Sequence, residues 1–78
     1  MILDQWNKDA FKGYAKPLEK LEKAFKKAGR PISFYAFVAP LGIKMVRVIG
    51  NRGSQKVFCI EWASPAQAAK IVAAGVRA

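Results

Sequence analysis

The sequence predicts a single α+β domain with an amino-terminal helix or helix pair, a three-stranded antiparallel β-meander and a carboxy-terminal helix. Three observations predict it. Apolar residues recur every three or four positions before residue 30, aromatic and β-branched runs separated by turns follow, and an alanine-rich segment closes the chain. With 78 residues, 53% of them hydrophobic, the chain suffices for one core and not for two. Residues 1–78 are therefore expected to form one small basic domain.

Two helical segments are expected before residue 30. Pro17 fits the first turn of a helix, where its missing N–H costs nothing, and Gly29 is placed to cap that helix at its carboxy end. The sequence leaves open whether Pro17 separates two helices or kinks one, and whether the first segment is an irregular arm. Spacing predicts the first helix over about residues 4–15, with an apolar stripe of Leu3, Trp6, Ala10 and Tyr14. The stripe of the second is Leu18, Leu21, Phe25 and Ala28.

Three strands are expected over residues 32–38, 43–49 and 55–62, which are rich in aromatic and branched side chains. The first turn has Pro40 at its second position and Gly42 at its fourth, and residues 50–54 form the second turn. Such short connections join antiparallel neighbours.

The carboxy-terminal helix has the clearest start signal. Ser64 is the expected cap, Pro65 takes the first helical position, and Gln67 completes a capping box. Gly75 is expected to end the helix. The predicted core comprises Leu21, Phe25, Phe34, Phe58, Ile60 and Ile71.

Neither face of the predicted sheet is plainly polar, although a solvated antiparallel sheet usually alternates apolar and polar residues. Either helices cover both faces, or one face stays open and meets a partner. The better candidate for an open face carries Tyr35, Phe37, Met45, Arg47, Val57, Cys59 and Glu61.

Catalysis finds little support in the residue types. The chain has no histidine, the commonest general base and metal ligand, and its five carboxylates show no converging spacing. Cys59 is expected mid-strand without an activating base. We therefore expect no enzyme, catalytic residue, metal or cofactor. The longest uncharged stretch, residues 31–43, is too short to span a membrane, and the start does not resemble a signal peptide, so a cytoplasmic protein is expected.

Charge is the most informative property. Fourteen Lys and Arg against five Asp and Glu give +9, which favours binding to a polyanion, DNA or RNA. A solvated helix face and ordinary hairpin-tip chemistry explain some of these residues equally well. The candidate contacts on the helix are Lys20, Lys23 and Lys27, in one stripe with Lys16. Those on the sheet and its turn are Lys44, Arg47, Asn51, Arg52 and Lys56, which Arg30 could join.

The order helix, three strands, helix is similar to double-stranded-RNA-binding domains, and residues 64–74 (SPAQAAKIVAA) look like the closing helix of that family. The family clamps phosphates with lysines at the start of this helix, where this chain has Pro65, Ala66 and Gln67 instead. The histidine that the family carries in the first hairpin is also missing from this chain. Residues 34–74 also resemble the three-strands-then-helix DNA-binding domains of phage integrases and plant ethylene-response factors. That resemblance implies base or phosphate contacts by Lys44, Arg47, Arg52 and Lys56.

The alternative function is protein–protein interaction. In this interpretation the chain is a small interaction or inhibitor protein, of the kind that phages and mobile elements encode. It would dock on an acidic protein patch or form a homodimer through a sheet face, and its charge would mainly speed association.

Overall fold

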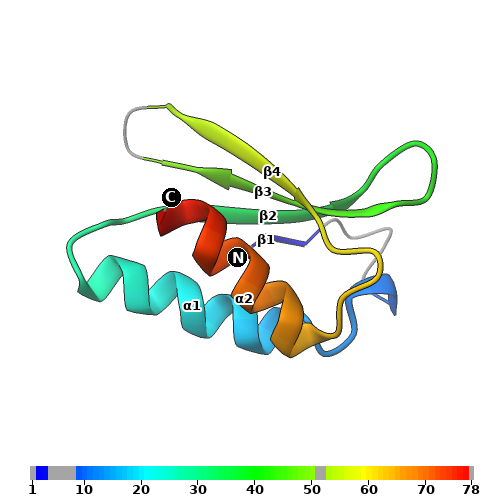
Figure 1. Cartoon of the computed structure of the whole chain (residues 1–78), viewed down its shortest axis with the longest axis horizontal. Coiled ribbons are helices and arrows are strands. Elements are labelled where there is room, and N and C mark those ends of the chain that lie inside the picture. The colour runs from blue at the N-terminus through cyan, green and yellow to red at the C-terminus, as the bar shows by residue number, and fades with distance from the viewer. Residues whose placement is uncertain (1, 4–8, 51–52, 78) are drawn as a thin grey trace.

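The structure is a computed structural model that describes residues 2–3, 9–50 and 53–77. A four-stranded sheet has the order β1-β2-β3-β4, and Figure 1 shows both helices on one side of it. The α+β class is confirmed, and the expected three-stranded meander gains a fourth strand. The elements are β1 (Ile2–Leu3), α1 (Ala15–Lys27), β2 (Ser33–Val38), β3 (Lys44–Ile49), β4 (Gln55–Cys59) and α2 (Pro65–Arg77).

The fourth strand, β1, corrects the expectation for the amino-terminal segment. Leu3 belongs to β1, which pairs in parallel with β2, so it is not part of a helical stripe. Asp9 to Phe11 form a 3₁₀ turn, and Gly13 then adopts a φ of +86°, which interrupts helical geometry before α1 begins at Ala15. The first helix expected over residues 4–15 is therefore wrong in the residues described. Residues 4–8, including Trp6, lie outside them.

The single α1 helix starts and ends as its sequence predicts. Pro17 is its third residue, within the first turn, where backbone N–H groups have no helical partner. At the other end Gly29 has a φ of +80°, and its N–H donates to the Lys26 carbonyl at 3.1 Å. The Arg30 N–H donates to the Phe25 carbonyl at 2.8 Å, which completes a Schellman cap.

Both hairpins of the antiparallel meander close with the same device. The Gly42 N–H donates to the Ala39 carbonyl at 2.8 Å, and Gly42 has a φ of +82°. The Gly53 N–H likewise donates to Gly50 at 3.1 Å, with a φ of +76°. A turn followed by a residue at positive φ is a common three- to five-residue hairpin connection, and it makes the strands on either side antiparallel neighbours.

The closing helix begins as expected and ends later than expected. The Gln67 N–H donates to the Ser64 hydroxyl at 3.3 Å, and the Ser64 N–H donates to the Gln67 side chain at 3.1 Å, so the capping box is confirmed. Gly75 does not end α2, which continues to Arg77. Its role is close packing, because a Cβ at Gly75 would lie 2.0 Å from the ring of Phe58.

The core lies between the helices and the sheet. Phe25, Phe34 and Ile60 are buried as predicted, and Leu21 and Phe58 pack against the core while partly exposed. Ile71 is 40% exposed, so its assignment to the core is wrong. The neighbouring α2 residues Ala68 and Val72, four apart, are fully buried instead. The last strand also ends earlier than expected, and Trp62, beyond it, is 93% exposed.

Candidate nucleic-acid interface

Four exposed cations gather at one end of the molecule. Both helices end there, and β3 ends and β4 begins at the same end, on the left of Figure 1. We call this region the basic end. It comprises Lys23 and Lys26 of α1, Arg30 after the helix cap, and Lys56 of β4, all exposed. Residues far apart in the sequence therefore share one surface.

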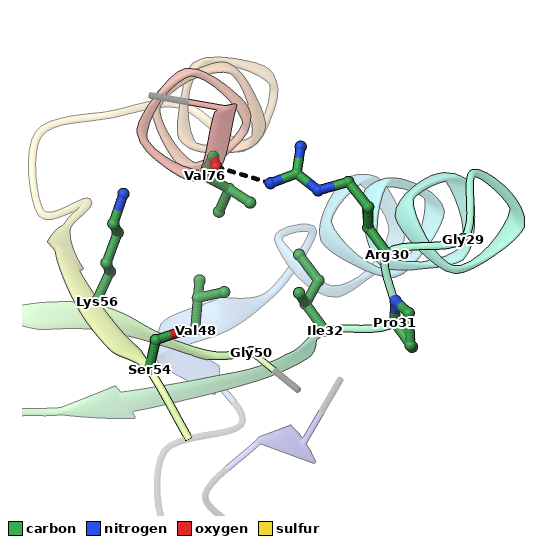
Figure 2. A pocket seen from close by; sticks show the side chains of 9 residues that line it. All are labelled: Gly29, Arg30, Pro31, Ile32, Val48, Gly50, Ser54, Lys56 and Val76. Carbon is green, nitrogen blue, oxygen red and sulfur yellow. Dashed lines mark hydrogen bonds between the residues drawn. The ribbon is translucent and has the colours of Figure 1, made fainter. Parts of the chain in front are cut away.

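The first pocket of the basic end holds about 580 Å³ between Arg30 and Lys56, which Figure 2 shows on opposite sides of it. The Arg30 guanidinium donates to the Val76 carbonyl at 3.3 Å, and the Lys56 ammonium donates to the Gly75 carbonyl at 2.8 Å. These carbonyls belong to the last turn of α2, where they lack helical partners. The contacts orient both cations without neutralising them, since a carbonyl carries no net charge. The pocket is lined by Gly29, Arg30, Pro31, Ile32, Val48, Gly50, Ser54, Lys56 and Val76.

A second pocket of about 480 Å³ adjoins the first and shares Pro31, Ile32 and Gly50 with it. Lys23 and Lys26 line it, together with Glu22, Ser33 and Ile49. Glu22 is the one acid among the lining residues of the two pockets, and its carboxylate accepts the Phe34 N–H at 2.8 Å. The two pockets therefore form one surface with four cations and a single carboxylate that already has a backbone donor.

The structure brings one cation from each of the two predicted groups to the basic end. Lys23 comes from the exposed stripe of α1, whose other members are Lys16, Lys20 and Lys27, and Lys56 comes from the sheet. Asn51 and Arg52 lie outside the described residues. Lys26 was missed, because its position four residues after Glu22 suggested an ordinary helical ion pair. The cap at Gly29, which turns the chain toward the sheet, is the signal that could have identified it.

The three described cations of the sheet do not share a face. Arg47 lies opposite Tyr35, on the side away from the helices, and its guanidinium is 5.0 Å from the centre of the Phe37 ring. Lys44 and Lys56 lie on the helix side, in register with Val38 and Val48. The Lys44 ammonium is 5.4 Å from the Tyr14 ring, so this lysine contacts the interior of the fold.

Among the described residues, both helices lie on one side of the sheet and none covers the other side, as the arrangement with one open face requires. We call that other side the open face. The exposed side chains of Arg47, Val57 and Cys59 lie on it. Glu61 does not join it, because its carboxylate accepts the Lys44 N–H at 2.7 Å. By register the open face comprises Ile2, Ser33, Tyr35, Phe37, Met45, Arg47, Ile49, Gln55, Val57 and Cys59, none of them acidic.

Within the described part of the chain, no group of three or more His, Cys, Asp or Glu residues could hold a metal ion. Cys59 is a free, exposed thiol. No helix among the described residues is long and apolar enough to cross a membrane.

Comparison of the chain with protein-family models, curated proteins and solved structures finds no match.

Proposed function

We propose that this protein is a non-catalytic nucleic-acid-binding module that holds phosphate groups at the basic end. One observation carries the proposal: exposed cations from α1, the segment after it and β4 surround two adjoining pockets with a single, already engaged carboxylate. Clusters of this kind attract polyanions by releasing the counterions condensed on them.

The side chains suit phosphate chemically. Arg30 has five N–H donors and Lys56 has three, and each uses one on a carbonyl of α2. Their remaining donors can bind phosphate oxygens, and the Ser54 hydroxyl lines the same pocket. Lys20 and Lys27 extend the charge along α1, and Arg52 and Asn51 belong to the same proposal from the sequence.

The test is a salt titration of binding to duplex DNA, duplex RNA and single strands. A phosphate-driven complex loses affinity linearly on a log–log plot, with a slope near −0.9 per contact on duplex DNA. Replacing Lys23 and Lys26 with Gln should reduce the slope by about two contacts. The control is Lys12→Gln, which removes one charge from an exposed site before α1, away from the basic end. The change in slope is compared per charge removed, and an equal change per charge for the control and the double variant would contradict this interface.

A second candidate function rests on a separate observation. A groove of about 420 Å³ between β4 and α2 is lined by Cys59, Trp62, Ala63, Gln67, Lys70 and Ile71. Trp62 is 93% exposed, and tryptophan is enriched among the residues that dominate protein interfaces. A homodimer through this groove should show concentration-dependent sedimentation that Trp62→Ser abolishes. A single monomeric species at every concentration would exclude it.

A further inference from the structure

The open face combines aromatic rings with a planar cation. Tyr35 and Phe37 are two residues apart on β2, so their side chains leave the same side of the sheet about 7 Å apart along the strand. Arg47 lies directly across from Tyr35, and its guanidinium stacks over the Phe37 ring at 5.0 Å. Rings and guanidinium planes are the surfaces on which unpaired bases stack.

This face is continuous with the basic end. Ser33 and Ile49 are cross-strand partners at the end of the open face, and both line the second pocket beside Lys23 and Lys26. No open-face residue is acidic, and Arg47 adds a positive charge at its centre. A chain whose phosphates lie at the basic end can therefore continue along β2 and β3 without meeting a like charge.

We infer that the preferred ligand is a single-stranded nucleic acid, with phosphates at the basic end and bases stacked on Tyr35, Phe37 and Arg47. This inference rests on the proposed function and specifies its substrate class. Bases in a duplex are covered by their neighbours, so a duplex offers the open face only its edges and backbone. An unpaired base presents its π-face, and such stacking tolerates any sequence.

The experiment compares three ligands of equal length: oligothymidylate, an abasic sugar-phosphate strand and a DNA duplex. Both single strands have the same charge, so only base contacts separate them. We expect oligothymidylate to bind more tightly than the abasic strand by about five- to 150-fold for each base that stacks. Binding to the duplex should be weaker than binding to oligothymidylate, because only the single strand adds stacking on the open face.

Two conservative variants assign this preference to the open face. Phe37→Leu removes the ring and keeps an apolar side chain, and Arg47→Lys keeps the charge and removes the planar guanidinium. Each should reduce the ratio between oligothymidylate and the abasic strand at least severalfold while leaving abasic binding unchanged. Leu41→Ala is the control, because Leu41 is 87% exposed on the hairpin at the opposite end. Thermal unfolding verifies that every variant is folded.

The outcomes separate the two proposals. Equal binding of oligothymidylate and the abasic strand, or a ratio that neither variant changes, would overturn the inference and leave phosphate binding at the basic end intact. Tighter binding to the DNA duplex than to oligothymidylate would also overturn it. Absence of salt-dependent binding to all ligands would remove the proposed function as well.

Discussion

Arg30 links the ends of the two helices through a single side chain. Its guanidinium lies 5.6 Å from the centre of the Phe25 ring in α1 and donates to the Val76 carbonyl in α2. Its backbone N–H completes the cap of α1 at Phe25. The same residue lines the first pocket of the basic end, so structural and proposed binding roles converge on it.

Two substitutions separate these roles. Arg30→Lys keeps the charge, so the salt slope of binding should not change, while stability should fall by about 0.5–1 kcal/mol with loss of the stacked plane. Arg30→Gln should lower stability similarly and reduce the slope by about one contact. Chemical unfolding and salt titration measure the two effects. If both variants reduced the salt slope of binding equally, the geometry of the guanidinium, and not its charge, would govern binding.

One pair of variants tests which residues belong to the core. Phe25 is 6% exposed, so Phe25→Ala should lower the free energy of unfolding by about 3–5 kcal/mol. Ile71 is 40% exposed, so Ile71→Ala should cost less than about 1 kcal/mol. Urea unfolding of both variants provides the comparison. A larger loss of stability for Ile71→Ala than for Phe25→Ala would contradict the observed orientation of α2.

At the scale of elements, predictions succeeded where the signal is local. The cap at Gly29, the capping box of Ser64 and Gln67 and the turn at Gly42 depend on a few adjacent residues, and all three are present. Strand β1 has two residues, too few to show a period, and it exists because β2 lies beside it. The sequence therefore could not reveal it.

Orientation was harder to predict than element type. Ile71 and Val72 are adjacent and both apolar, so only the docking of α2 determines which one is buried. Lys23 and Lys56 were candidates from the sequence, yet their meeting at the basic end depends on both helices ending beside the start of β4. Lys56 faces the helices only because both helices pack on that side of the sheet, and the sequence composition does not reveal on which side they pack.

The capping box of α2 gives the test at this scale. Ser64→Ala removes the acceptor of the Gln67 N–H and should lower stability by about 1 kcal/mol. Adding Gln67→Ala should cost less than the sum of the two single effects, because the two hydrogen bonds form one reciprocal unit. Thermal unfolding of the three variants measures this coupling. Strict additivity would mean that each contact acts alone.

For the whole molecule, a net charge of +9 opposes compaction, and part of that charge is concentrated at the basic end. Raising the salt concentration from about 50 to about 200 mM screens this repulsion and should raise the unfolding temperature. Lys23→Gln should raise the unfolding temperature at low salt and weaken its salt dependence. Lys12→Gln, away from the basic end, should have a smaller effect, and equal effects would argue against a local concentration of charge.

The contact between Gly75 and Phe58 makes the docking of α2 directly visible by nuclear magnetic resonance. The ring lies where a side chain would project from Gly75, so one of the two Hα protons faces the aromatic ring current and the other does not. The two protons should therefore resonate at clearly separate frequencies in the folded protein. If α2 detaches from the sheet, the ring current no longer distinguishes them and their frequencies converge. This glycine is thus a natural spectroscopic reporter of whether the closing helix is in place.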